Sequence, residues 1–218
     1  LEEGTELLHR LKANLVDKDN KEPLPMTTSC SPGWVKFFEH IYPEMLSHMS
    51  TCKSPQQMFG ALAKTYYAKK IDVDPAKMVC VSIMPCTAKK FEADRPEMRD
   101  SGYKDVDYVL TTRELAIMIK QAGIEFADLP NEGFDTIMGK STGAGVIFGA
   151  TGGVMEAALR TVYEIVTGRE VPFKDLNITP VRGLEGVKEA NVKIEKALPE
   201  YKFLEGVEVK CAVAHGLA

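Results

Sequence analysis

The sequence lacks the cysteine patterns of closed metal sites and of secreted disulfide frameworks. No CxxC pair and no cysteine–histidine zinc spacing occurs among its five cysteines, which are Cys30, Cys52, Cys80, Cys86 and Cys211. An odd number of scattered cysteines favours a reducing compartment. Spacing alone therefore predicts neither a zinc module nor a disulfide-linked domain.

Long apolar runs and basic clusters are also missing. The longest apolar stretch, Ala144 to Met155, is too short and too rich in glycine for a bilayer span, and no charged-then-apolar leader precedes it. The net charge is −4, and lysine and arginine are spread along the chain, so nucleic acid is not an expected partner. We expect a cytoplasmic protein without a membrane span.

What is present is an ordinary globular composition with a strand-and-helix pattern. Apolar residues make up 44% of the 218 residues, enough for a real core. Strand-then-helix order predicts an α/β fold with mostly parallel sheets flanked by helices, in one or two lobes. The expected elements are helix 2–15, helices opening at Ser31-Pro32 and Ser54-Pro55, strand 77–83, helix 87–98, strand 108–110, helix 112–121, glycine-rich loop 139–153, helix 154–167, and strands 178–181 and 208–214.

Cys86 lies where the strand at 77–83 gives way to a helix, in the segment MPCTAKK at 84–90. A helix N-terminus and the ammonium groups of Lys89 and Lys90 favour thiolate over thiol, the form that binds iron or acts as a nucleophile. A semi-buried structural cysteine is the alternative. Ligands in α/β folds collect at such junctions, so both interpretations stay open.

Cys30 lies just before a predicted helix start, in TTSCSPGW at 27–34. Ser31 as a helix N-cap would explain the segment without any chemistry, while Cys30 remains a candidate for it. Cys52, Cys80 and Cys211 are weaker candidates, because the last two fall in apolar strands where core packing is the usual role.

The glycine-rich segment at 143–153 precedes a strong amphipathic helix. Exposed amides and the helix dipole could cradle an anion there, whereas close helix packing explains the glycines equally well. Neither a Walker nor a dinucleotide-binding pattern is present. The four histidines share no spacing, and acidic residues such as Glu6 and Glu92 would by themselves be interpreted as solvated helix faces.

Taken together, these segments resemble the iron-only ([FeFe]) hydrogenase family through nearly the whole chain. The matching motifs are TTSCSPGW at 27–34, CKSPQQMFGALAKTYY at 52–67, SIMPCTAKKFEADRPEM at 82–98, TTRELAIMIKQAGI at 111–124 and IFGATGGVMEAALR at 147–160. The resemblance implies that residues 1–218 are a partial catalytic domain, truncated at both ends, with two lobes around a buried cofactor cleft. The family's third, cysteine-rich signature would lie beyond residue 218.

The resemblance also implies the cofactor, a [4Fe–4S] cluster joined through a shared thiolate to a di-iron subcluster with CO, cyanide and a dithiolate bridge (the H-cluster). Cys86 matches one of the cluster ligands, and thiolate is a suitable donor for such a cluster. Lys89 matches the lysine that hydrogen-bonds a cyanide. The residues that match positions packed around the cofactor are Pro55, Gln56, Met84 and Phe148.

A proton relay follows from the same resemblance. Cys30 matches the cysteine that hands protons to the bridging amine, Glu92, Ser50 and Glu6 match its path to solvent, and Arg10 lies beside the exit. The family usually has a second cysteine where this sequence has Ser31, and that second cysteine ligates the cluster. Either Ser31 ligates the iron, Cys30 changes role, or the cluster here is a weakened variant.

The implied function is oxidation and production of dihydrogen, with electrons passing to iron–sulfur modules or subunits that are NAD(P)- or ferredoxin-linked. The cofactor carries the bond-breaking chemistry, and the protein supplies ligands, orientation and proton access. We expect the isolated 218-residue piece to be inactive. A hydrogen sensor or cluster-assembly factor of the same family is the alternative, and a metal-free thiol enzyme using Cys86 is a third, disfavoured by the absence of a cysteine–histidine pattern.

Overall fold

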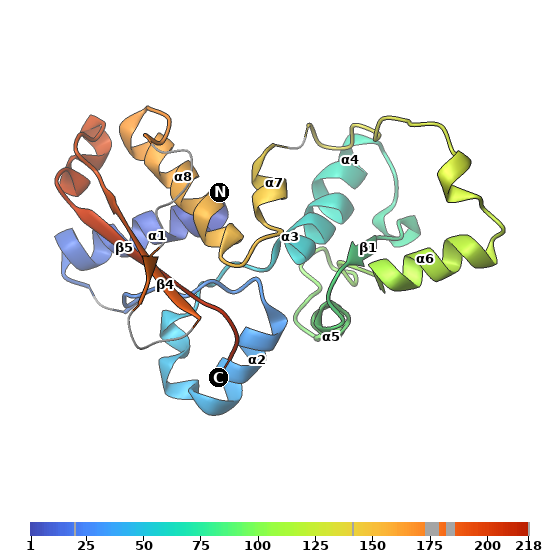
Figure 1. Ribbon diagram of the computed structural model, residues 1–218, viewed down its shortest axis with the longest axis horizontal. Coiled ribbons are helices and arrows are strands. Elements are labelled where there is room, and N and C mark those ends of the chain that lie inside the picture. The colour runs from blue at the N-terminus through green and yellow to red at the C-terminus, as the bar shows by residue number, and fades with distance from the viewer. Residues whose placement is uncertain (20, 141, 173–178, 182–185, 218) are drawn as a thin grey trace. The chain divides into compact units, whose positions relative to one another are not determined.

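The computed structural model of the chain describes residues 1–218 except 20, 141, 173–178, 182–185 and 218 (Figure 1). The chain divides into two compact units. The first unit comprises Leu1–Ser29, Trp34–Cys52 and Ser141–Ala218, and the second comprises Cys30–Gly33 and Lys53–Lys140. None of the helices in the described part of the chain combines the length and the apolar character that a bilayer span requires.

The first unit contains two long helices and a small sheet. Its elements are α1 (Glu2–Lys12), η1 (Ala13–Asp17), most of α2 (Pro32–Ile41), η2 (Pro43–His48), α7 (Ala144–Ile147), α8 (Gly153–Thr167), β3 (Thr179–Pro180), β4 (Val187–Lys193), η6 (Pro199–Leu204) and β5 (Glu208–Ala214). Helix α8 ends at Gly168, which has a left-handed φ of 66° as the sequence predicts for a C-terminal glycine.

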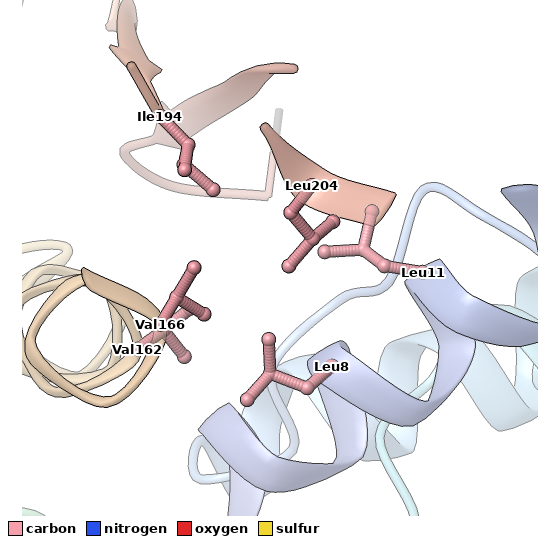
Figure 2. Packing of buried hydrophobic residues seen from close by; sticks show 6 residues of the cluster. All are labelled: Leu8, Leu11, Val162, Val166, Ile194 and Leu204. Carbon is pink, nitrogen blue, oxygen red and sulfur yellow. The ribbon is translucent and has the colours of Figure 1, made fainter. Parts of the chain in front are cut away.

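The core of the first unit joins α1, α8 and the sheet (Figure 2). Val209 of β5 packs against a buried cluster of residues from α1, α8, the position directly after β4 and η6, namely Leu8, Leu11, Val162, Val166, Ile194 and Leu204. Complete burial of each such side chain contributes about 1.5–3 kcal/mol. A Cβ atom on Gly4 would lie 2.9 Å from Val162 Cγ2, so glycine is what allows α1 and α8 to approach this closely.

The sheet of the first unit is antiparallel, with strand order β3-β4-β5. Ala190 of β4 pairs with Cys211 of β5, and alternate β4 residues point into a second cluster with Leu159 of α8. The alternation along β4 and β5 is that of a sheet covered on one face. The predicted strand at 208–214 is confirmed, whereas the one predicted at 178–181 falls partly outside the described residues.

The second unit begins with helical segments, which are followed by a stretch of β-α-β-α order. Its elements are α3 (Pro55–Leu62), η3 (Ala63–Tyr67), α4 (Ala68–Lys70), η4 (Pro75–Lys77), β1 (Val81–Met84), α5 (Ala88–Asp94), β2 (Tyr108–Thr111), α6 (Thr112–Gln121) and η5 (Phe126–Asp128). Strands β1 and β2 are parallel, with Met84 opposite Thr111, so both strands end side by side and each leads into a helix. The predicted α/β architecture is thus confirmed.

Local hydrogen bonds explain the boundaries in the second unit. Helix α6 starts with a capping box, in which the Thr111 hydroxyl accepts from the Glu114 amide and the Glu114 carboxylate accepts from the Thr111 amide. The strand predicted from residue 77 begins only at Val81, because Asp74 caps a 3₁₀ turn over Pro75–Lys77. Helix α5 ends at Asp94, four residues before the predicted end.

Candidate functional site

Cys86 lies in the short connection between β1 and α5 and is exposed. The Lys89 amide donates to the Cys86 carbonyl at 3.4 Å, a hydrogen bond that leads into the first turn of α5. Met84, at the end of β1, packs partly buried against a core of Ala93, Val106 and Val109. The prediction that Cys86 sits at a strand-to-helix junction is confirmed, and its thiol is available to a ligand.

Lys89 connects this junction to Cys30 within the second unit. Its ammonium group donates to the Cys30 carbonyl oxygen at 2.7 Å and forms an ion pair with Glu92 at 3.0 Å. Both side chains of that pair are nearly buried, with 12% and 6% of their surface exposed. The nearly buried ammonium group of Lys89 therefore joins Cys30 to Glu92, although these two residues are distant in the sequence.

Glu92 is a buried carboxylate with several donors, although its helix pattern alone would leave it in solvent. It is 4% exposed, and its Oε1 atom accepts from the Ser54 hydroxyl and from Gln56 Nε2 at 3.4 Å. Gln56 also donates to the Lys89 carbonyl at 3.2 Å and accepts from the Ser82 hydroxyl at 2.8 Å. Buried carboxylates need such donors to remain ionised.

Ser54 occupies the N-cap position of α3, as its sequence context predicts, with Pro55 exposed at the first helical position. Its hydroxyl donates to Glu92 instead of serving as a cap acceptor for the helix. A serine before a proline is expected to cap a helix with its hydroxyl oxygen. Here the Ser54 hydroxyl is the hydrogen-bond donor to the buried carboxylate of Glu92. Ser54 is thus a site residue that sequence reasoning missed.

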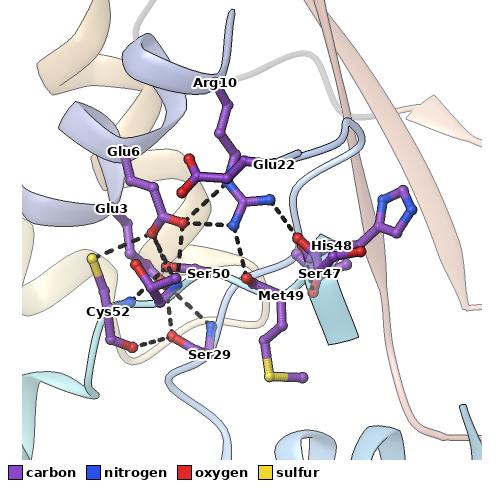
Figure 3. Close-up of polar contacts among 12 residues, drawn as sticks. Glu3, Glu6, Arg10, Glu22, Ser29, Ser47, His48, Met49, Ser50 and Cys52 are labelled. Carbon is purple, nitrogen blue, oxygen red and sulfur yellow. Dashed lines mark hydrogen bonds and ion pairs between the residues drawn. The ribbon is translucent and has the colours of Figure 1, made fainter. Parts of the chain in front are cut away.

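In the first unit, Glu6 of α1 is the centre of a second network (Figure 3). Its Oε2 atom accepts from the Ser50 hydroxyl at 2.6 Å, and its two oxygens accept from the Thr51 amide at 3.1 and 3.0 Å. Arg10 donates to Oε1 from Nη2 at 2.7 Å and from Nε at 3.0 Å. Burial alone would raise the pKa of Glu6, but these hydrogen bonds and the charge of Arg10 together lower it.

Arg10, which the resemblance places beside the exit of the relay, is 1% exposed, so its guanidinium group is buried. Its remaining guanidinium donors reach the carbonyl oxygens of Pro23, Ser47 and Met49 at 3.1, 2.8 and 2.9 Å. The spacing of Glu6 and Arg10, four apart on α1, is confirmed as one helix face. Arg10 ties α1 to the segment that carries Ser50.

Glu3 is a buried acid in this unit that sequence reasoning missed. It is 9% exposed, and its Oε1 atom accepts from the amide of Ser29 at 3.1 Å and from its hydroxyl at 3.4 Å. The Ser29 hydroxyl also donates to the Cys52 carbonyl. The sequence signal for this role was the spacing of Glu3, Glu6 and Arg10, which puts two acids and a base on one predicted helix.

The remaining cysteines are protonated thiols. Burial raises the pKa of Cys211 to about 11, and it also raises the pKa of Cys80. The pKa of Cys52 rises to about 11, again first through burial and then through the negative charge of Glu6, against a lowering contribution from Ser50. Among the described residues, no group of three or more metal-binding side chains is assembled. Cys86 and Cys30 therefore remain the ligand candidates.

The glycine-rich segment serves helix packing. A Cβ atom on Gly153 would lie 1.9 Å from the Ile147 carbonyl oxygen, and Gly152 has a φ of +80°. The segment itself contains the short helix α7, so in this described stretch α8 is preceded by a helix and not by a strand. Phe148, at the end of α7, is 40% exposed. Close packing is the interpretation that these distances support.

The structure therefore brings the predicted residues together in two groups, one in each unit. The second unit joins Cys30, Gln56, Lys89 and Glu92, with Cys86 and Met84 at the neighbouring strand end. The first unit joins Glu6, Arg10 and Ser50. Each group contains a carboxylate with little exposure that is held by hydroxyl and cationic donors, which is an arrangement suited to storing and passing protons.

Comparisons with known proteins match the whole chain. The family model for "Iron only hydrogenase large subunit, C-terminal domain" covers residues 1–218. The chain is 53% identical over 217 residues to the NADP-reducing hydrogenase subunit HndD of Solidesulfovibrio fructosivorans, with 100% of this chain and 35% of that protein covered. It is 54% identical over 215 residues to the periplasmic [Fe] hydrogenase large subunit of Nitratidesulfovibrio vulgaris, with 99% and 47% covered.

Solved structures agree with the sequence matches. The apo [FeFe]-hydrogenase HydA1 from Chlamydomonas reinhardtii superposes with a TM-score of 0.80 at 43% identity, over 99% of this chain and 57% of that one. A more distant relative is the cytosolic Fe-S cluster assembly factor narfl of Xenopus tropicalis, 32% identical over 207 residues, with 91% and 43% covered. The chain thus spans between about a third and a half of the curated relatives it matches.

Proposed function

Since the chain belongs to the iron-only hydrogenase large-subunit family, we propose that it forms part of the catalytic domain of an [FeFe]-hydrogenase that interconverts dihydrogen with protons and electrons. The observation that carries this proposal is a pair of carboxylates with little exposure, the buried Glu92 in one unit and the nearly buried Glu6, 11% exposed, in the other. Each is held by a serine hydroxyl and by a buried cation. Removing a carboxylate from water costs folding free energy, so such groups are expected where protons have to be moved.

The residues of the second unit fit one corner of the implied cofactor. Cys86 presents an exposed thiol at the end of β1, and soft thiolate suits iron–sulfur clusters. Lys89 holds a positive charge one turn further along α5, where it would favour an anionic ligand. Further cluster ligands would have to come from Cys30, from Ser31 or from outside these 218 residues.

In this proposal, the bound H-cluster supplies the splitting and formation of dihydrogen. Cys86 would hold the [4Fe–4S] part, and Lys89 would hold the cyanide-bearing di-iron part. By the resemblance, Gln56, Met84, Pro55 and Phe148 match residues around the cofactor, a role in which they would restrict access of water. Lys89 additionally fixes the backbone of Cys30 through its 2.7 Å hydrogen bond, which limits where that thiol can be.

We assign the proton-handling roles to the chain's own residues. The Cys30 thiol would exchange a proton with the cofactor amine, and Glu92 would accept and return a proton while Ser54 and Gln56 keep its carboxylate in place. Glu6 and Ser50 would form the other part of the relay, with Arg10 stabilising the ionised form of Glu6. Arg10 is thus a positioning residue in this proposal.

Electrons would leave through iron–sulfur modules or partner subunits. The NADP-reducing activity in the name of HndD supports an NAD(P)-linked acceptor. Reduction of NADP⁺ or of a ferredoxin by dihydrogen, measured on the complete protein with each acceptor in turn, tests this point. If neither NADP⁺ nor ferredoxin is reduced, the proposal that electrons pass to NAD(P)- or ferredoxin-linked partners is refuted.

The deciding experiment is infrared spectroscopy of the complete protein after maturation. We expect stretching bands of CO and cyanide together with uptake and evolution of dihydrogen. In Cys86→Ala, both the cluster iron and these bands should be lost, whereas in Cys211→Ala, which changes a partly buried cysteine of β5, they should persist. Retention of all metal by Cys86→Ala would refute the assignment.

A second candidate is a cluster-assembly factor without turnover, favoured by the similarity to narfl. The hydrogen-bond network around Glu6 argues against it, because such a factor has no need of a fast proton path. Bound cluster iron without CO or cyanide bands, in protein that neither takes up nor releases dihydrogen, would select this alternative.

A further inference from the structure

The thiol of Cys52 belongs to the Glu6 network of the first unit, although no function has been attached to it so far (Figure 3). Its Sγ atom lies 3.5 Å from Glu6 Oε2, within the range of an S–H···O hydrogen bond. Its amide donates to the Ser50 hydroxyl oxygen at 3.2 Å, and its carbonyl accepts from Ser29. Cys52 therefore contacts both relay residues of this unit.

The thiol is the donor in its contact with Glu6. With a pKa of about 11, caused mainly by burial, it stays protonated at neutral pH. The Glu6 carboxylate, whose own pKa is lowered, is ionised at the same pH and accepts. The contact therefore requires a charged Glu6 and a neutral Cys52.

The amide of Cys52 also sets the direction of the Ser50 hydroxyl. Because that oxygen accepts from the Cys52 amide, its own hydrogen is free to point at Glu6 Oε2, 2.6 Å away. The oxygen Oε2 thus receives the Ser50 O–H and the Cys52 S–H, and it shares the Thr51 amide with Oε1. The S–H group is the weakest of these donors, so its hydrogen bond to Glu6 is the one that we expect to break when the carboxyl group becomes protonated.

We propose that Cys52 is a positioning residue of the relay, which holds the ionised Glu6 and orients Ser50, and whose S–H bond to Glu6 is released when Glu6 takes up a proton. This role rests on the proposed function of Glu6 as a relay group. The other charged groups of the network are Arg10, which pairs with Glu6, and Glu3, whose charge also acts on the thiol. Both are present in every variant proposed below.

The test uses the S–H stretching band in the infrared spectrum of the complete protein, purified without the di-iron unit. A difference spectrum between wild type and Cys52→Ala isolates the band of this thiol. We expect it at lower frequency while Glu6 is ionised and at higher frequency once acid protonates Glu6. In Glu6→Gln the band should stay high and should no longer respond to pH.

Two further variants separate positioning from simple packing. Cys52→Ala should raise the pH midpoint of Glu6 protonation, and Cys52→Ser, which restores a donor, should bring it back. Cys211→Ala, which removes a thiol of similar pKa from the core next to Leu159, should leave both the band and the midpoint unchanged. A Cys52 band that ignores Glu6 protonation, or a midpoint equal in all variants, would overturn the proposal.

These results are independent of hydrogenase activity. Absence of CO and cyanide bands after maturation would refute the proposed function while leaving the S–H titration intact. Conversely, an unresponsive S–H band in a protein that oxidises dihydrogen would refute only the role of Cys52.

Discussion

Replacing Arg10 by methionine should cost the first unit a large part of its stability. The side chain is 1% exposed and donates to Glu6 and to three backbone carbonyl oxygens, so the change leaves a nearly buried carboxylate without its cation. Removing one partner of a buried ion pair lowers the free energy of unfolding by about 3–5 kcal/mol. Methionine keeps much of the apolar volume, so we expect a loss of about 4 kcal/mol in the free energy of unfolding.

The assay is urea unfolding followed by fluorescence of Trp34, the chain's one tryptophan, which lies in the same unit as Arg10. Glu6→Gln and the double variant complete a thermodynamic cycle, in which we expect the double variant to be less unstable than the two single losses predict. A decrease in the free energy of unfolding below about 1 kcal/mol in Arg10→Met would refute the reasoning. It would mean that the guanidinium contacts contribute no more to stability than an exposed ion pair does.

The pH dependence has a definite sign. Since the pKa of Glu6 is lowered in the folded protein, its stabilising contribution is fully present above the ordinary value of 4.5 and is lost as the pH falls through the lowered folded value. The stability difference between wild type and Glu6→Gln should therefore shrink in acid. A difference that grows in acid would contradict the network.

Three other substitutions test separate features. Gln57 is fully buried, and among the described residues its side-chain amide has no hydrogen-bond partner, so Gln57→Met should stabilise by about 1–3 kcal/mol in urea unfolding, whereas a loss would reveal a hidden partner. Gly60→Ala should destabilise by about 1–3 kcal/mol, because its Cβ would lie 2.5 Å from a backbone oxygen, while Gly33→Ala, with no described atom within 4 Å, should be near neutral. Glu92→Gln in the matured protein should lower turnover by about 10²–10⁴-fold with the CO and cyanide bands retained, and unchanged turnover would remove Glu92 from the relay.

Local signals account for what could be predicted. Helix α6 begins where the Thr111–Glu114 capping box places it, and α8 ends at Gly168, because both boundaries depend on residues within one turn. The place of Cys86 followed from the apolar strand before it. These features need no knowledge of distant parts of the chain.

Long-range partners account for what was missed. Glu3 and Ser54 have ordinary helix-start sequences, and only the fold brings Ser29 to the first and Glu92 to the second. The burial of Arg10 depends on carbonyl groups 13 to 39 residues away. The antiparallel sheet was likewise not anticipated, because alternation in β5 does not specify the direction of its neighbour.

The tight fit at Gly60 has a consequence for how mutations in α3 will be recognised. The same helix bears Gln56, and its N-cap is Ser54, so a shift of α3 away from the Asp105 backbone would withdraw two donors from Glu92 together. In the proposed hydrogenase, a single added methyl group in α3 would then slow the exchange of hydrogen and deuterium, although it lies outside the proposed iron ligands. Genetic screens for impaired catalysis should recover such packing lesions alongside lesions in the relay itself.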